Sequence, residues 1–188
     1  RIGVVRSEEA PRIDGRLDET VWGRAEVIGE LRQVEPFEGG PASESTEVRL
    51  LHDGESLYIG VRCNDTDPGA IRATQMQRDA DLGPDDRVQV LLDPIFDRRN
   101  GYLFRMNALG SRSDALVENN NRVRDDWDGI WEGRATIDEG GWTAEIRIPF
   151  KTLAFNPAAR GWGFNVERVI RRRNETVRWS GVRQDVSF

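Results

Sequence analysis

Apolar and polar residues alternate with a period of two along much of the chain. In Phe104–Asn107, for example, an apolar residue is twice followed by a polar one. Successive side chains of a β-strand point to opposite faces, so this alternation predicts strands with one face in a core and one face in solvent. The expected strands are Glu47–Leu50, Leu57–Cys63, Arg87–Asp93, Tyr102–Asn107, Trp131–Ile137, Trp142–Ile148, Gly163–Ile170 and Thr176–Trp179.

Turn-forming residues separate these segments. Asp53-Gly54, Asn100-Gly101 and Gly140-Gly141 each lie between two apolar runs. Many short strands joined by such turns are typical of an antiparallel arrangement. We therefore predict an all-β fold, an antiparallel β-sandwich of the jelly-roll or immunoglobulin-like kind.

One or two short helices are also expected. Leu17–Ala25 has acidic residues in its first turn and places Val21 and Trp22 on one apolar face. We expect it to plug one end of the sandwich. A second short turn is expected after Pro149.

The 188 residues suit one domain, 1–188. The chain begins at Arg1 with no apolar leader, which we interpret as a removed signal peptide or an excision from a longer chain. No run approaches the roughly 20 apolar residues of a membrane span, so no membrane insertion is expected. The net charge of −6 makes nucleic acid a poor partner, and we expect Arg171–Arg173 on a solvated edge strand.

The sequence contains no pattern typical of a catalytic site. Cys63 is the only cysteine and is expected to be a small buried residue. His52 is the only histidine, and no nucleophile motif accompanies it, so we predict no enzyme. A glycosidase, or haem held by His52 with Met76 or Met106, is a minor alternative.

Four segments in order resemble the family-nine carbohydrate-binding modules. They are Pro11–Ala25, Leu57–Asp65, Asp86–Asp93 and Gly141–Phe150. The resemblance extends from about residue 11 to about residue 180 and implies a non-catalytic module that binds a sugar or polysaccharide.

A closer resemblance is to the amino-terminal domain of large bacterial envelope proteins. It rests on Asp97–Tyr102, Asn107–Gly110, Trp127–Trp131 and Arg168–Arg173, together with Arg78-Asp79. This resemblance implies export to the periplasm, the outer membrane or the cell exterior, with the rest of the parent chain as a partner. It also supports an alternative function, a structural or protein-interaction domain that has lost sugar binding.

A sugar site needs an aromatic platform for its C–H face. Trp127 and Trp131 are the candidates, because they lie in a polar, glycine-containing segment between strands. The alternative for Trp131 is that it opens a strand and faces the core.

A sugar site also needs planar polar groups for the hydroxyls. Arg105 and Asn107 alternate with apolar neighbours and are our preferred pair. Arg78 and Glu145 complete the predicted ligand-binding set. Arg87, Gln89, Arg147 and Glu167 are expected to share one polar face with this set, or to form only a solvated outer face with weak ion pairs.

Two acidic clusters are candidates for a structural calcium ion, which family-nine modules often hold. One contains Asp65 and Asp67, and the other contains Asp79, Asp81 and Asp85. Calcium prefers several carboxylate and carbonyl oxygens on loops. The alternative is that these aspartates only form turns.

Overall fold

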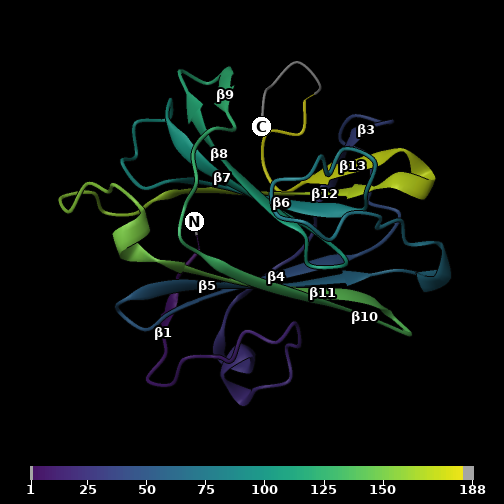
Figure 1. The fold of residues 1–188 in the computed structure, drawn as a ribbon, viewed down its shortest axis with the longest axis horizontal. Helices are drawn as coiled ribbons and strands as arrows, with labels where there is room; N and C mark the ends of the chain where they lie inside the picture. The colour runs from purple at the N-terminus through teal and green to yellow at the C-terminus, as the bar shows by residue number, and fades with distance from the viewer. Residues whose placement is uncertain (1, 184–188) are drawn as a thin grey trace.

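The protein is a sandwich of two stacked β-sheets (Figure 1), described by a computed structural model for residues 2–183. Within these residues one sheet, sheet A, has six strands and the other, sheet B, has seven. Sheet A contains β1 Val5–Arg6, β2 Val27–Ile28, β4 Thr46–His52, β5 Ser56–Asn64, β10 Glu132–Asp138 and β11 Gly141–Pro149. Sheet B contains β3 Arg32–Glu35, β6 Arg87–Asp93, β7 Gly101–Asn107, β8 Arg112–Glu118, β9 Arg122–Arg124, β12 Gly163–Ile170 and β13 Glu175–Arg178.

The strand order is β1-β4-β5-β11-β10 in sheet A, where β2 also pairs with β4, and β3-β13-β12-β6-β7-β8-β9 in sheet B. The pairs are antiparallel except β1 with β4. The predicted antiparallel β-sandwich is confirmed, and every predicted strand has a counterpart.

The core lies between the two sheets. Alternate residues of the central strands fill it, among them Val61, Val90, Phe104, Trp142 and Ile146. Each is fully buried. Burial of such a side chain contributes about 1.5–3 kcal/mol, so this alternation is the main source of stability.

The sequence did not reveal β8, because both of its faces are largely covered. Ala115 and Val117 point away from the main core and pack with Leu103 and Leu91 in a separate small cluster. A strand without a clear solvent face lacks the alternation that identifies a half-buried strand.

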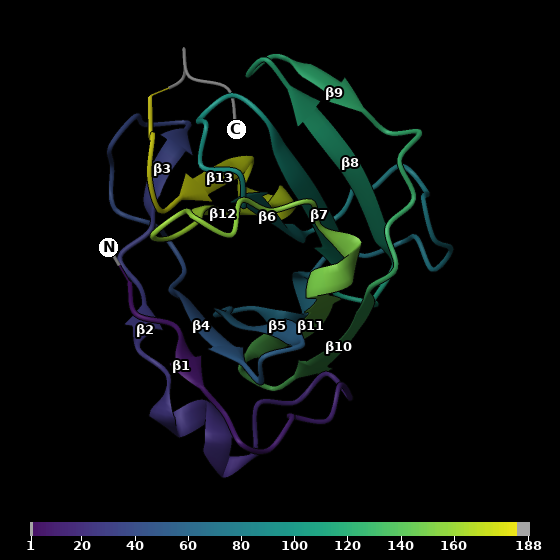
Figure 2. The ribbon, with the colours of Figure 1, turned by 90° about the vertical axis from the view of Figure 1, so that its left-hand side faces the viewer.

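The predicted amino-terminal helix is a single 3₁₀ segment, η1 Thr20–Arg24, and its predicted position is wrong. It lies against the outer face of sheet A, where the first part of the chain passes beneath that sheet in Figure 2. Val21 and Trp22 pack there on Leu51 and Tyr58, two apolar side chains on the outer face. This outer apolar patch, rather than an open end, accepts the helix.

Three further 3₁₀ turns are η2 Pro68–Ala70, η3 Phe150–Thr152 and η4 Arg171–Arg173. η3 confirms the turn expected after Pro149. η4 corrects the expected edge strand, because the chain turns there and reaches the left-handed conformation at Asn174. Within residues 2–183, no helix has the length and apolarity to cross a membrane.

Candidate functional site

A row of polar side chains crosses the outer face of sheet B. Strand pairing places Arg178 of β13 opposite Glu167 of β12, Glu167 opposite Gln89 of β6, and Gln89 opposite Arg105 of β7. Arg105 in turn faces Ser113 of β8. We call these five residues the polar row.

Hydrogen bonds join four members of the polar row. Arg178 donates to Glu167 from Nε and Nη2, at 2.9 and 2.7 Å. Gln89 donates to the other oxygen of Glu167 at 2.5 Å and accepts from Arg105 Nε at 3.1 Å. Arg105 Nη1 also donates to Asp125, which follows β9, at 2.9 Å. Each planar group is therefore held in one orientation before a ligand arrives.

A cleft of about 450 Å³ lies over one end of the polar row, and we call it the sheet-B cleft. Gln89, Arg105 and Ser113 line it, and loop 79–83 forms a wall. Arg87 fixes that wall by donating from Nη1 to two carbonyl oxygens of the loop, each at 3.1 Å.

Several polar groups of the sheet-B cleft have no partner among the described residues. These are the hydroxyl of Ser113, the Nη2 group of Arg105 and one carboxylate oxygen of Asp125. Asp79 also lines the cleft, and partial burial together with neighbouring carboxylates raises its pKa. The cleft thus offers donors and acceptors side by side, as sugar hydroxyls require.

Arg78 does not line the sheet-B cleft. Its Nη2 group donates to Asp114 at 3.0 Å and to the carbonyl of Gly129 at 2.9 Å, and it also pairs with Asp128. Asp114 is buried and accepts from the Gly129 amide at 2.6 Å. Arg78 therefore fixes the segment that carries Asp125, instead of meeting a ligand.

The two predicted platform tryptophans pack against the core. Trp131 is only 2% exposed and donates from its indole to Asp114 at 3.0 Å, so it presents no face to a ligand. The alternative interpretation of Trp131, that its side chain faces the core, is therefore confirmed. Trp127 is half-buried, with its ring centroid 5.0 Å from that of Tyr102 and 6.0 Å from that of Phe104.

Replacing Trp127 by alanine is expected to lower the free energy of unfolding by about 2 kcal/mol, because a half-buried aromatic contact with the core is lost. Sugar affinity is expected to stay within about twofold, because Trp127 does not line the sheet-B cleft. Urea unfolding and calorimetric titration of the same variant check both statements. A large loss of sugar affinity without loss of stability would contradict this prediction and indicate that Trp127 contacts the ligand.

Asn107 is fully buried and cannot reach a ligand. Its amide donates to the Gln75 carbonyl at 2.8 Å and to Asp85 at 2.7 Å, and its oxygen accepts from the amides of Leu109 and Ser111. Burial alone would raise the pKa of Asp85, but hydrogen bonds from Asn107 and Thr74 outweigh it and lower the pKa. The pair is a structural connection between loops.

Glu145 lies on sheet A, on the other side of the molecule from the polar row. It accepts from the amides of Asp14 and Gly15 at 2.9 and 2.8 Å and from the indole of Trp22 at 3.1 Å. These contacts hold residues 12–25, the N-terminal strap, on the outer face of sheet A. The strap covers Glu145 completely, so Glu145 is a structural residue. The prediction of one polar face shared with Arg105 is wrong, because alternation cannot tell which sheet a strand joins.

The strap explains the glycine of the Ile13-Asp14-Gly15 segment. Gly15 has φ +89°, and an added Cβ would lie 2.9 Å from the backbone carbon of Ala135. Only glycine fits this close approach without strain.

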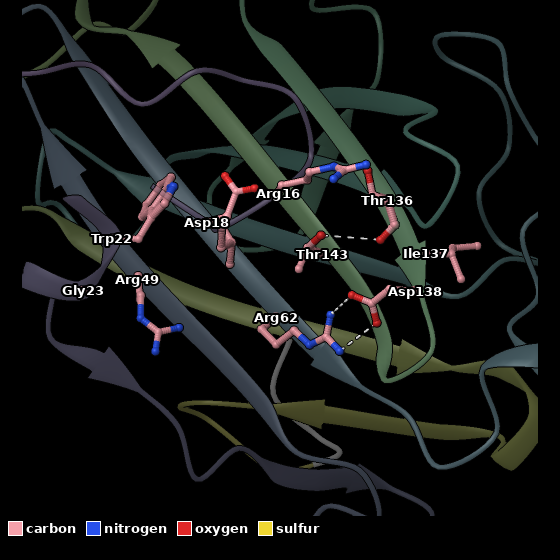
Figure 3. A pocket seen from close by; sticks show the side chains of 11 residues that line it. Arg16, Asp18, Trp22, Gly23, Arg49, Arg62, Thr136, Ile137, Asp138 and Thr143 are labelled. Carbon is pink, nitrogen blue, oxygen red and sulfur yellow. Dashed lines mark hydrogen bonds and ion pairs between the residues drawn. The ribbon is translucent and has the colours of Figure 1, made fainter. Parts of the chain in front are cut away.

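A second cleft, of about 620 Å³, lies between the strap and the β10–β11 hairpin (Figure 3). Arg62 faces Asp138 across it and donates to both carboxylate oxygens, at 2.5 and 2.9 Å. Arg49 pairs with Glu47 at 2.9 Å. Each of these two ion pairs is neutral by itself, and the described residues of this cleft form no linked set of planar groups like the polar row.

The predicted calcium ligands are placed apart from one another. Asp65 is 6% exposed and pairs with Arg172 at 2.6 Å and with Arg168 at 3.5 Å, so guanidinium groups surround it. Asp67 is exposed, Asp79 and Asp81 line the sheet-B cleft, and Asp85 is buried. Among residues 2–183, no three histidine, cysteine or acidic side chains are grouped to hold a metal ion. Calcium stays a prediction from the family resemblance.

Of the predicted ligand residues, only Arg105 lines the sheet-B cleft. Gln89, Arg87 and Glu167, expected on a polar face, do lie around Arg105. Ser113, Asp125 and Arg178 were missed, because their places depend on strand register and on a loop conformation that no local pattern encodes.

Comparison with known proteins gives a consistent result. The family model described as "Carbohydrate family 9 binding domain-like" matches residues 13–184. No curated protein matches.

Solved structures share the fold. A candidate carbohydrate-binding protein from Bacteroides uniformis is 13% identical, with a TM-score of 0.73, covering 94% of this chain and 87% of its own. A family 9 carbohydrate binding module from Caldicellulosiruptor kristjanssonii in complex with cellotriose is 17% identical, with a TM-score of 0.68, covering 95% and 84%. The same organism's module in complex with glucose is 18% identical, with a TM-score of 0.68, covering 94% and 83%.

The family model spans most of the chain, and the two-sheet fold agrees with it. The chain belongs to the carbohydrate family 9 binding domain-like family.

Proposed function

We propose that this domain is a non-catalytic carbohydrate-binding module and that it binds a saccharide in the sheet-B cleft. Arg105 carries the proposal, because it lines the cleft and its guanidinium group is held in place by Gln89 and Asp125. Membership of the family supports it, as do the glucose and cellotriose complexes of the similar modules.

Recognition in this cleft rests on hydrogen bonds to hydroxyl groups. Arg105 and Asp125 form an ion pair at 2.9 Å and keep one another in position. Charge-assisted hydrogen bonds contribute about 1.5–3 kcal/mol each, more than neutral ones. Among the described residues that line the cleft none is aromatic, so the aromatic platform expected from the sequence is missing here and recognition rests on the orientation of polar groups.

Binding, and not hydrolysis, is the activity that this arrangement supports. The cationic groups Arg87 and Arg105 lie among the acidic side chains of the cleft. Asp125 lies beside Arg105, where its carboxylate group suits a hydrogen-bond acceptor.

Replacing Arg105 by glutamine is expected to weaken sugar binding about tenfold or more, since one charge-assisted contact and the position of Asp125 are lost. Calorimetric titration with glucose, cellotriose and a panel of other oligosaccharides measures this. Arg49→Gln is the matched control, because the Arg49 side chain is 22% exposed and paired with a carboxylate, as Arg105 is at 21%, but on sheet A.

A panel without any binding heat would favour the alternative, a structural or protein-interaction domain that has lost sugar binding. Equal loss of affinity in the Arg49 and Arg105 variants would place the sugar elsewhere.

A further inference from the structure

A third cleft, of about 950 Å³, opens at one end of the sandwich between the two sheets, and we call it the end cleft. The β4–β5 turn, η3 and the start of β12 meet there, on the side that faces the viewer in Figure 2. The end cleft shares no lining residue with the sheet-B cleft.

Aromatic side chains form the walls of the end cleft. Phe150, Trp162, Phe164 and Trp179 line it, and each is only half-buried. Phe150 meets Trp162 edge-on at 5.5 Å, and Phe164 lies 5.9 Å from Trp179. Half-exposed rings held against one another form a preformed apolar surface. A ligand that covers this surface removes it from water, which is favourable.

The base of the end cleft is also apolar. Leu50, Leu57 and Leu92 lie there and belong to the main core. A concave site of this size with mostly apolar and aromatic walls is typical of small-molecule pockets. A hydrocarbon group is the chemistry that matches it.

The charge at the end cleft is positive. Arg160 lines it, is exposed, and has no ion pair or side-chain hydrogen bond among the described residues. Within residues 2–183 no aspartate or glutamate lines the cleft, although the chain as a whole carries a net charge of −6. An anionic group would therefore find its partner at Arg160.

A saccharide fits the end cleft poorly. Its hydroxyls surround the ring and each needs a partner, whereas among the described residues that line this cleft only His52, Arg160 and the indole N–H groups of Trp162 and Trp179 are polar. We propose that the end cleft binds an amphiphilic anion, a molecule with an aliphatic hydrocarbon body in the aromatic cleft and one carboxylate at Arg160. This site is separate from the proposed sugar site.

The test compares three probes with ten-carbon chains: decanoate and decyltrimethylammonium below their micelle concentrations, and decan-1-ol below its solubility limit. Binding is measured by calorimetry and by the fluorescence of the intrinsic tryptophans. Decanoate is expected to bind more tightly than decan-1-ol by about threefold, as for an exposed ion pair, and decyltrimethylammonium more weakly than both. Arg160→Gln is expected to lower the affinity for decanoate to that for decan-1-ol and to leave the affinity for decan-1-ol unchanged.

Two variants test the location. Trp162→Ala is expected to lower the affinity for decanoate about tenfold or more, because the side chain that forms one wall of the end cleft is lost. Gly161→Phe is designed to fill the cleft, since Gly161 lines it and an added Cβ there meets no atom within 4 Å. Gly23→Phe is its matched control, because Gly23 has the same open space but lies against the outer face of sheet A.

Loss of decanoate binding in Trp162→Ala and Gly161→Phe, with normal binding in Gly23→Phe and Arg105→Gln, would support the site. Unchanged binding in both end-cleft variants, or equal loss in Gly23→Phe, would overturn it. Equal affinity for decanoate and decan-1-ol in the natural protein would overturn the anionic part.

Discussion

Replacing Asp65 by asparagine is expected to lower the free energy of unfolding by about 3–5 kcal/mol, because it removes the only carboxylate within 4 Å of the buried Arg168 side chain among the described residues. The Arg168 side chain is 2% exposed and lies 3.5 Å from Asp65, whose side chain is 1% exposed. Arg168 Nη1 reaches only neutral oxygens, the Ser45 carbonyl at 3.1 Å and the Thr46 hydroxyl at 3.2 Å. Urea unfolding followed by circular dichroism measures the loss.

Asp67→Asn is the control for this prediction. Asp67 is two residues further along the same loop and is exposed, so its replacement is expected to change the free energy of unfolding by less than about 0.5 kcal/mol. The pair also tests calcium. If both aspartates held an ion, both variants would lose stability only in the presence of calcium. A calcium-independent loss confined to Asp65→Asn would favour the ion pair with Arg168.

Raising the pH from about 5 to about 8 is expected to lower the free energy of unfolding by about 2.5 kcal/mol through Glu145 alone. Burial raises the pKa of Glu145 from an ordinary 4.5 to about 7 in the folded protein. Between these values the folded state keeps a proton that the unfolded state releases. The contribution of Glu145 is therefore complete below pH 4.5 and is lost as the pH rises through about 7.

Glu145→Gln isolates this effect, because glutamine does not titrate. The free energy of unfolding of the natural protein is expected to fall more steeply with pH than that of the variant. The raised pKa of Asp86, which burial also causes, contributes to both slopes and cancels in the comparison. Glu132→Gln, an exposed change on the neighbouring β10, is expected to keep the natural slope. Identical slopes for natural protein and Glu145→Gln would contradict the prediction.

Local chemistry accounts for what sequence analysis found of the candidate site. Arg105 was identified because it alternates with Phe104 and Met106, and that alternation alone places it on the outer face of its strand. Asn107 has the same alternation but is fully buried, because Gln75 and Asp85 cover it from a loop more than 20 residues away. Periodicity defines a face, but it does not reveal what later covers that face.

The same limit explains the tryptophans and the strap. A polar, glycine-containing segment suggested an exposed platform at Trp127 and Trp131, yet Asp114 and Arg78 draw that segment against the sandwich. The apolar side of η1 was correctly expected to be buried, but the surface that receives it comes from β4 and β5. Both outcomes depend on partners distant in sequence.

The sequence by itself determined the all-β class, the positions of the central strands and the family, because period-two alternation, turn residues and short motifs are local properties. Only the tertiary structure decided which strands share a sheet, and therefore that Arg178, Glu167, Gln89, Arg105 and Ser113 form one row. It also decided that Glu145 lies on the other sheet and that aromatic residues gather at the end cleft. The physical reason is that register and sheet order come from the joint packing of segments far apart in the chain, which no single segment specifies.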